Sequence, residues 1–164
     1  MCPEETSAAD KLQIRTCKRG DIATVLEIQT QAPEAAAWSG AAVEEALRGD
    51  ARLFLVAALA GEVAGFAVAR LVTDEAEILN FAVKKVFRRR GIGQRLIEAL
   101  LNQLHEQGAT RVFLEVRESN AAAIAFYRKL GFENVGRRPA YYQQPDEAAF
   151  IMEAQLQRNL HPAV

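Results

Sequence analysis

The sequence predicts a single α/β domain in which helices cover both faces of a mixed sheet. Three observations predict it: apolar runs of strand length, helical apolar periodicity between them, and a glycine-rich turn that joins a strand to a helix. The chain has 164 residues, half of them apolar and a quarter charged, which suits one globular domain with its own core. We expect residues 11–157 to form this domain, between a disordered extension at 1–10 and a tail at 158–164.

The first half of the chain is expected to place two helices between strands. Its apolar residues change from period two to period 3.6 and back, and polar N-cap residues stand where each helix should begin. The expected elements are a strand at 12–16, a helix capped by Asp21, a helix capped by Ser39 that ends near Gly49, and strands at 53–59 and 63–72. The short segment between the last two strands predicts a tight hairpin.

The second half is expected to alternate between strands and helices. Its elements are a strand at 76–84, a helix that ends near Gln107, a strand at 111–116, a helix from Ser119 or Asn120 to Leu130, and strands at 132–137 and 148–156 around a loop at 141–145. The strand, helix and strand across 76–116 predict a right-handed crossover between two parallel neighbours. Asn80 interrupts the apolar run of the first of these strands and predicts a bulge, which would help the two strands splay.

Composition and charge argue against several classes of function. The formal net charge of −1 does not suit general nucleic-acid binding, which needs a basic face. No apolar run reaches membrane-spanning length, so we expect a cytoplasmic protein without a membrane partner. The two cysteines and two histidines lack the spacing of a zinc site, and a disulfide framework is not expected either. For the oligomeric state we expect a monomer or a weak dimer.

A basic, glycine-rich turn is the candidate site for an anionic ligand. Glycine tolerates positive φ and lets a ligand approach the backbone closely, and the unpaired N–H groups at a helix start favour an anion. Arginines add charged donors that suit phosphate. The spacing fits neither a P-loop nor the three-glycine dinucleotide loop. The turn consists of Arg88, Arg89, Arg90, Gly91, Ile92 and Gly93. We interpret it as a pyrophosphate cradle, with a solvated helix cap as the alternative.

Two segments of the chain resemble the GNAT superfamily of N-acetyltransferases. Arg88-x-x-Gly91-x-Gly93 matches the pyrophosphate motif of that superfamily, and residues 120–132 are similar to its second conserved block. With the order of elements, the resemblance covers about 12–156. It implies the GNAT fold, a mostly antiparallel sheet of six to seven strands that splays between two parallel strands. It also implies acetyl-CoA as the cosubstrate, with no metal.

A narrower resemblance is to the bacterial ribosomal-protein-alanine N-acetyltransferases, the RimI group. It is carried by residues 114–127, by Trp38-Ser39 and by Tyr141-Tyr142. It implies transfer of acetyl to the N-terminal α-amino group of a protein, a small-subunit ribosomal protein in that group. The chain departs from the group near Gln144, where Asp-Gly is common and this sequence has Gln-Gln-Pro-Asp-Glu. That difference bears on the sequence preference for the acceptor.

Two residues are candidates for the catalytic chemistry. Glu115 lies inside a short strand, where a carboxylate is costly unless it faces a cleft, and the resemblance implies a general base. The alternative is an ion pair with Arg111 or Arg117. Tyr127 follows Asn120 by two helical turns and can protonate a departing thiolate, with a half-buried aromatic anchor as its alternative. Asn120 should cap its helix, and the resemblance implies a contact with coenzyme A as well.

Further residues are assigned to the donor and the acceptor. The resemblance implies that acetyl-CoA, the acetyl donor, binds to the strand before the turn and to the turn itself. These residues are Phe81, Ala82, Val83, Arg88, Arg89, Arg90, Gly91, Ile92, Gly93 and Gln94. The backbone N–H of Val83 is the candidate oxyanion donor. Trp38, Tyr141 and Tyr142 are hypothesised to line the acceptor mouth, although Trp38 fits a structural role equally well. Glu34, Glu44 and Glu45 could attract a cationic N-terminus or form a solvated helix face.

Three functions remain open from the sequence. The first is acetylation of a protein N-terminus. The second is acetylation of a small-molecule amine or of protein lysine on the same scaffold. The third is a non-catalytic module that binds acyl-CoA.

Overall fold

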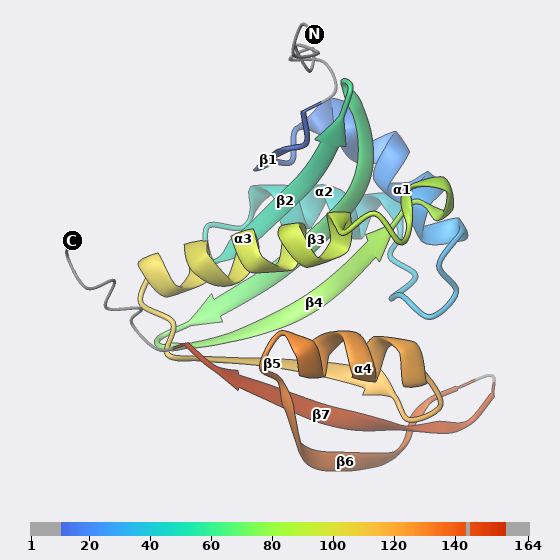
Figure 1. Cartoon of the computed structure of the whole chain (residues 1–164), viewed down its shortest axis with the longest axis vertical. Coiled ribbons are helices and arrows are strands. Elements are labelled where there is room, and N and C mark those ends of the chain that lie inside the picture. Colours follow the sequence, from blue (N-terminus) through green and yellow to red (C-terminus); the bar gives the residue numbers. More distant parts are fainter. Residues whose placement is uncertain (1–10, 144, 157–164) are drawn as a thin grey trace, which may run out of the picture.

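The computed structural model describes residues 11–143 and 145–156, which form one seven-stranded sheet with helices packed around it (Figure 1). The predicted order of strands and helices is confirmed. The expected extension at 1–10 and the tail at 158–164 lie outside the described residues. The elements are β1 (Gln13–Thr16), η2 (Arg19–Asp21), α1 (Ile22–Thr30), α2 (Gly40–Arg48), β2 (Arg52–Leu59), β3 (Glu62–Val72), β4 (Glu75–Val83), η3 (Lys85–Phe87), α3 (Ile92–Glu106), β5 (Arg111–Arg117), α4 (Ala121–Lys129), β6 (Glu133–Tyr142) and β7 (Glu147–Gln155).

The strand order in the sheet is β1-β2-β3-β4-β5-β7-β6, and neighbours are antiparallel except for β4 and β5. The mixed, mostly antiparallel sheet is therefore confirmed. Parallel pairing of β4 with β5 runs only from Glu75↔Arg111 to Glu77↔Phe113. Beyond these pairs the two strands diverge, and Figure 1 shows β4 turning away from β5 toward its C-terminal end. Among the residues that the structure describes, no strand pairs with β4 beyond Glu77 on that side.

A β-bulge in β4 accompanies this divergence. The register with β3 shifts between Val68↔Asn80 and Ala69↔Ile78, so Leu79 is the additional residue. The bulge predicted from Asn80 is confirmed, one position away from that residue. Because a bulge bends the strand that carries it, β4 changes direction just after its pairing with β5 ends.

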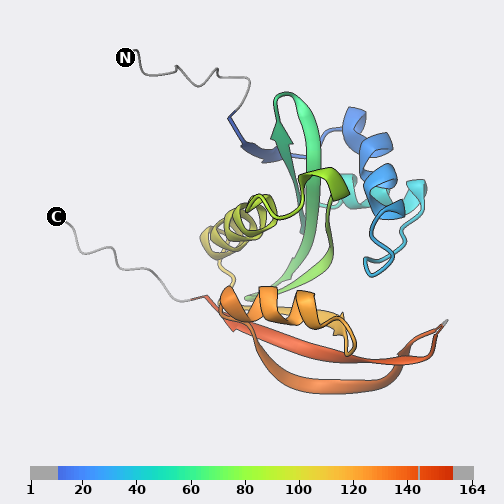
Figure 2. The ribbon, with the colours of Figure 1, turned by 45° about the vertical axis from the view of Figure 1, so that its right-hand side comes forward.

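Helices cover the sheet on both faces, as predicted. Figure 2 shows α3 on one side of β2, β3 and β4, and α1 with α2 on the other side. Each helix buries an apolar stripe, and each buried aliphatic side chain contributes about 1.5–3 kcal/mol. The fully buried residues include Leu96, Ile97, Leu100 and Leu104 of α3, and Val25, Ile28 and Val43 of α1 and α2. No helix in the described part of the chain combines the length and apolar character needed to cross a membrane.

Of the three predicted N-caps, Ser39 and Asn120 are confirmed and Asp21 is wrong. The side chain of Ser39 accepts a hydrogen bond from Ala42 N–H at 3.1 Å, as expected for a cap. Asp21 makes no capping bond to α1. Its carboxylate instead binds the Arg15 guanidinium at 2.7 and 3.0 Å and accepts the Lys18 N–H at 2.8 Å. The short helix η2 turns Asp21 back toward β1, where the guanidinium is a stronger partner than a free N–H group.

The predicted loop around Tyr141 is also corrected. Strand β6 continues through Tyr142, so Tyr141 and Tyr142 lie at the end of a strand. Its pairing with β7 is irregular between Arg138 and Tyr142, and Ala140 has φ +52°. The irregular segment includes Pro139, and its sequence lacks the alternation of apolar and polar residues from which a strand is predicted.

Candidate active site

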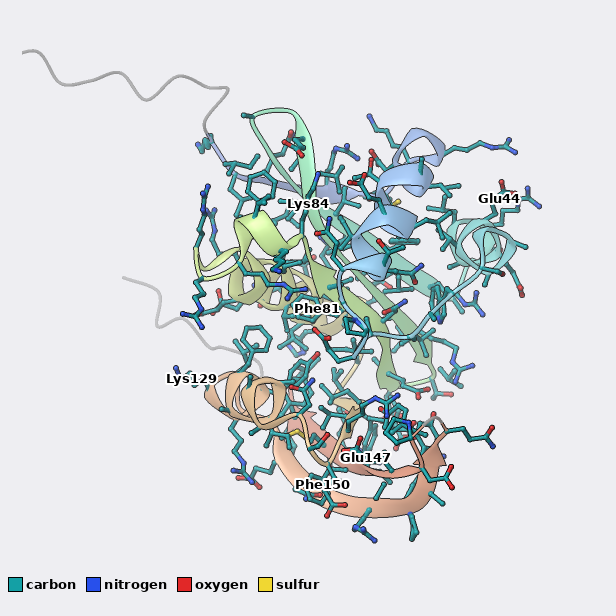
Figure 3. The ribbon with its side chains drawn as sticks, turned by 90° about the vertical axis from the view of Figure 1, so that its right-hand side faces the viewer. Glu44, Phe81, Lys84, Lys129, Glu147 and Phe150 are labelled. Atoms are coloured by element: carbon teal, nitrogen blue, oxygen red, sulfur yellow. The ribbon has the colours of Figure 1, made fainter. Side chains whose placement is uncertain are left out.

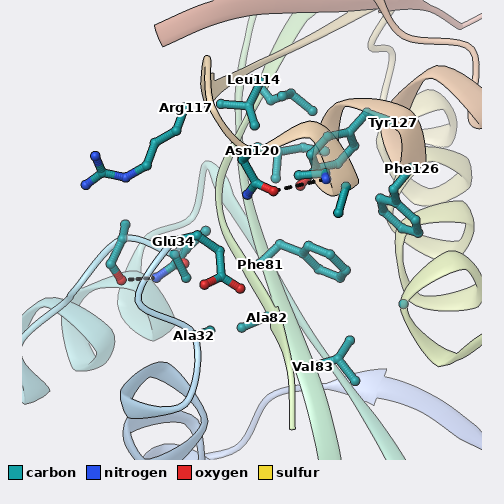
Figure 4. Close-up of a pocket in the computed structure, with 18 of the residues that line it drawn as sticks. Ala32, Glu34, Phe81, Ala82, Val83, Leu114, Arg117, Asn120, Phe126 and Tyr127 are labelled. Atoms are coloured by element: carbon teal, nitrogen blue, oxygen red, sulfur yellow. Dashed lines mark hydrogen bonds between the residues drawn. The ribbon is translucent and has the colours of Figure 1, made fainter. Parts of the chain in front are cut away.

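A cavity of about 830 Å³ lies where β4 and β5 diverge, a volume typical of small-molecule sites (Figure 4). Its walls come from the segment between α1 and α2, the starts of α3 and α4, and the ends of β4, β5 and β6. The predicted site residues that line it are Trp38, Phe81, Ala82, Val83, Arg88, Arg89, Gly91, Ile92, Gly93, Gln94, Glu115, Asn120, Tyr127, Tyr141 and Tyr142. Arg90 is not among the lining residues; its guanidinium lies 5.6 Å from the centre of the Phe87 ring.

The first turn of α3 presents free N–H groups at one end of the cavity. Gly91 precedes the helix with φ +74°, a left-handed conformation that glycine adopts without strain. The N–H groups of residues 91–94 have no hydrogen-bond acceptor among the described residues, and the first bond in this region joins Arg95 N–H to Gly91 C=O. A Cβ atom on Gly93 would lie 3.1 Å from Phe81 Cζ, closer than an ordinary van der Waals contact, so any side chain here would press on the Phe81 ring. These N–H groups can receive an anion.

Arg88 ties this turn to two other segments. Its Nε donates to the carbonyl of Val83 and its Nη2 to the carbonyl of Gln31, both at 3.0 Å. Two of the donors that were assigned to phosphate are therefore used within the protein. Arg88 holds the end of β4 and the end of α1 beside the cradle, and a direct contact of its guanidinium with a ligand stays a prediction.

The backbone N–H of Val83 points into the gap between β4 and β5. The next residue, Lys84, donates its N–H to Ala64 of β3 at 2.7 Å. Because N–H groups alternate in direction along a strand, the N–H of Val83 points away from β3. No strand pairs with this part of β4 on that side in the described range. This geometry agrees with the oxyanion role predicted for that N–H.

Tyr127 lies in a cluster of aromatic rings at the centre of the cavity wall. Its ring centre is 5.2 Å from that of Phe126, 5.6 Å from Phe132 and 6.4 Å from Phe81. Figure 3 shows Phe81 between the two halves of the molecule, and Figure 4 shows Tyr127 and Phe126 on α4 beside it. The Tyr127 hydroxyl has no hydrogen-bond partner among the described residues, and burial raises the pKa of its phenol above the usual range. The phenol therefore keeps its proton at neutral pH.

Glu115 faces the cavity, but its ion pair is not the one predicted. Its side chain is 15% exposed, and its Oε1 lies 3.2 Å from Arg138 Nε. Arg111 pairs instead with Glu75 and Glu153, and Arg117 pairs with Glu147. Since β7 lies between β5 and β6, Arg138 reaches Glu115 across an intervening strand. Hydrogen bonding to the Glu115 carboxylate raises the pKa of Tyr141 to about 12.

Comparison with known proteins decides the family. Residues 21–132 match the acetyltransferase (GNAT) family. The chain belongs to this family.

Relatives of this GNAT protein include a narrower group. The [ribosomal protein bS18]-alanine N-acetyltransferase of Escherichia coli is 45% identical over 94 residues, 56% of this chain and 64% of that enzyme's length. The enzyme of the same name from Haemophilus influenzae is 35% identical over 147 residues, 88% of this chain and 97% of that enzyme. The crystal structure of the ribosomal-protein-S18-alanine N-acetyltransferase from Escherichia coli superposes with a TM-score of 0.78 and 34% identity, covering 92% and 99% of the two chains. Both tiers of the predicted resemblance are confirmed.

Acidic residues around the acceptor end of this GNAT site separate into two sets. Glu34 lines the cavity, and Figure 4 shows its carboxylate directed toward Phe81. Glu44 lies on α2 away from Phe81 and pairs with Arg48 at 3.2 Å, which is the solvated-face alternative (Figure 3). Glu45 is exposed and does not line the cavity. Asn120 caps α4 by accepting Ala123 N–H at 3.1 Å, as predicted.

Three site residues were not found from the sequence. Arg138 was one of several charged residues in an irregular strand, and nothing local links it to Glu115. Gln29 and Asn80 are 51 positions apart, yet Asn80 Nδ2 donates to Gln29 Oε1 at 3.0 Å. Asn80 was noted only for the bulge, although a polar residue in an apolar run also indicates a buried hydrogen bond. In the described residues no group of three or more His, Cys, Asp and Glu side chains is placed to hold a metal.

Proposed function

We propose that this chain transfers the acetyl group of acetyl-CoA to the N-terminal α-amino group of a protein, with an alanine-starting small-subunit ribosomal protein as acceptor. One observation carries the proposal: free N–H groups at the start of α3, the Glu115 carboxylate and the Tyr127 phenol line the same cavity. The choice of acceptor is supported by the names of the relatives, and a cytoplasmic location goes with it.

The cavity fits the donor at its phosphate end. The N–H groups of residues 91–94 would hold the two linked phosphates, and the absence of a side chain on Gly93 keeps this turn close to β4. The N–H of Val83 would bind the thioester carbonyl oxygen, since it points into the gap. Bound acetyl-CoA supplies an activated acetyl group, so the protein needs only to align it with an amine.

Glu115 is the proposed proton acceptor for the incoming ammonium. An α-amino group with a pKa of about 7.7–8.0 is roughly 10–20% neutral at pH 7, whereas a lysine of pKa about 10.4 is less than about 0.1% neutral. One carboxylate that acts as the base therefore suits a protein N-terminus better than a lysine side chain.

Tyr127 is the proposed proton donor to the leaving sulfur. Its phenol lines the cavity, keeps its proton and has no competing partner within the described residues. A raised pKa makes the phenol a weaker acid, so its contribution begins as a hydrogen bond to the sulfur as negative charge develops there. The rings of Phe81, Phe126 and Phe132 pack around Tyr127, which is 8% exposed, and these apolar surroundings would strengthen that bond.

Mass spectrometry of acetylated peptides tests the proposal. The purified protein is mixed with acetyl-CoA and with two peptides of one sequence, each with an internal lysine, one beginning with free alanine and one with a formylated α-amine. We expect one acetyl group on the α-amine of the free peptide and no product from the formylated peptide. Acetylation of lysine in both peptides, or transfer only to small amines such as spermidine, would overturn the proposed acceptor.

A further inference from the structure

One wall of the cavity is a segment without helix or strand, residues 31–39 between α1 and α2. Five of its residues line the cavity: Ala32, Glu34, Ala35, Ala36 and Trp38. Figure 4 shows this segment facing Phe81 and the end of β4. Its backbone forms a few turn hydrogen bonds of its own, so its position depends on side chains from elsewhere.

Two amide side chains, half-buried Gln29 and buried Asn80, hold the end of this segment. The Nε2 of Gln29 donates to the carbonyl of Trp38 at 3.1 Å, and the N–H of Trp38 donates to Gln29 Oε1 at 3.2 Å. Asn80, which is 4% exposed, donates from Nδ2 to Gln29 Oε1 and to the carbonyl of Ala36, both at 3.0 Å. The side chain of one strand residue thus binds both the last turn of α1 and the segment itself.

Each amide has only one possible orientation. The carbonyl of Trp38 requires the nitrogen of Gln29 to face it, so the oxygen of Gln29 faces Asn80. Asn80 must then present its nitrogen, because the opposite orientation would place its oxygen against two acceptors. Its Oδ1 is left buried without a hydrogen-bond partner in the described residues. This unpaired buried acceptor costs stability and offsets part of what the two hydrogen bonds from Nδ2 contribute.

We propose that Asn80 and Gln29 act as a clamp that fixes residues 31–39 across the cavity, which makes Asn80 a positioning residue for acceptor binding. This inference rests on the proposed function for the identity of the acceptor. Asn80 lies next to the bulge of β4, and the same strand presents the Val83 N–H to the gap. One strand therefore sets both the donor backbone and the acceptor wall.

Trp38 is the only tryptophan in the chain, so its fluorescence reports directly on the clamp. In the structure it is half-buried and packs on the core beside α1. We expect Asn80→Ala and Gln29→Ala each to shift its emission to longer wavelength and to increase quenching by acrylamide. Neither acetyl-CoA nor a peptide is needed for this measurement. Unchanged emission and quenching in both variants would overturn the clamp.

Two further variants separate hydrogen bonding from packing. Asn80→Asp keeps the shape of the side chain but places an oxygen against Gln29 Oε1 and Ala36 C=O, so we expect it to disturb Trp38 at pH 7 as much as Asn80→Ala does. If Asn80→Asp behaves like the wild type, shape alone positions the segment and the clamp is refuted. The matched control is Asn102→Ala, at an exposed position of α3 that does not line the cavity.

Kinetics then test the link to the acceptor. We expect Asn80→Ala to raise the KM for an alanine-starting peptide about tenfold, as for the loss of two hydrogen bonds, with the Kd for acetyl-CoA unchanged. An equal loss in acetyl-CoA affinity, or an unchanged KM, would overturn the positioning role. If the wild-type protein acetylates no peptide, the proposed function fails, whereas the fluorescence comparison still decides the clamp.

Discussion

Arg138 Nε lies 3.2 Å from Glu115 Oε1, across the intervening strand β7. The proposed proton acceptor of the site therefore already has a cationic partner. An incoming ammonium group would approach the same carboxylate. Because 57% of the Arg138 side chain is exposed, this ion pair is weak enough for a substrate cation to displace it.

Removal of Arg138 should make the carboxylate easier for the acceptor to reach. We expect Arg138→Ala to lower the KM for an alanine-starting peptide by up to about fivefold, the scale of an exposed ion pair. Steady-state kinetics at varied peptide concentration measure this. Arg137→Ala is the control, because Arg137 pairs with Glu118, which does not line the cavity. A higher KM in Arg138→Ala would show that Arg138 holds Glu115 in place rather than competing for it.

Tyr127→Phe isolates the proposed proton donor. We expect kcat to fall by about 10²–10⁴-fold, with little change in acetyl-CoA affinity. Thermal stability should be unchanged or slightly higher, since the lost hydroxyl has no partner among the described residues. Kinetics, calorimetry and a melting curve make the comparison, and a normal kcat would remove Tyr127 from the chemistry.

The raised pKa of Tyr127 also sets the alkaline behaviour of the wild-type enzyme. A phenol whose pKa is raised by burial stays protonated through pH 10, so its deprotonation should not lower activity there. We expect kcat/KM for the peptide to rise between pH 6 and about pH 8 as the α-amine loses its proton, and then to level off. A decline centred near pH 9 would mean that a different group donates the proton.

Gly91→Val tests the phosphate cradle. A β-branched residue at φ +74° is strained, and its side chain would stand where the phosphates approach. We expect acetyl-CoA affinity to fall at least about tenfold, or ~1.4 kcal/mol, in calorimetry. Gly108→Val is the matched control, because Gly108 has φ +102° at the far end of α3 and is also exposed. Both variants should lose stability, and equal acetyl-CoA affinity in the two would contradict the cradle.

The Arg15–Asp21 pair should make stability depend on pH. The guanidinium hydrogen bonds lower the pKa of the Asp21 carboxyl, so the pair stabilises the fold above the unfolded pKa of about 3.9 and less as the pH falls through the lowered value. We expect Asp21→Asn to reduce the free energy of unfolding by about 1.5–3 kcal/mol at pH 7 and by much less near pH 2. Urea unfolding at both pH values measures this, with the exposed Asp50→Asn as control. A difference of equal size at both pH values would contradict the linkage.

Elements could be predicted where the residues that determine them are close together in the sequence. The apolar stripe of α3, the glycine before it and the N-caps Ser39 and Asn120 all depend on residues within a few positions of one another. The bulge beside Asn80 had a local signal as well. The family motifs then placed Glu115 and Tyr127 on elements that the structure brings to one cavity.

Predictions were wrong or missing where a residue's partner is distant in the sequence. The partner of Glu115 follows from the order of β5, β7 and β6, which the sequence does not reveal. Asp21 matched the pattern of a helix cap, but η2 directs its carboxylate toward the Arg15 guanidinium, which binds it more strongly than a free N–H group would. The amide contact between Gln29 and Asn80 joins residues 51 positions apart, and nothing in either local pattern selects that pair.

The short junction between β4 and β5 has a mechanical consequence. Within the described part of the chain, three residue pairs join β4 to β5, the strands at which the two halves of the sheet meet, so backbone hydrogen bonds couple these halves weakly. A ligand bound beyond that junction would contact both halves and stabilise their relative position. The loaded protein should then resist heat better than the free one, by about 2.7 kcal/mol at a hundredfold excess over Kd. Occupancy and rigidity would rise together.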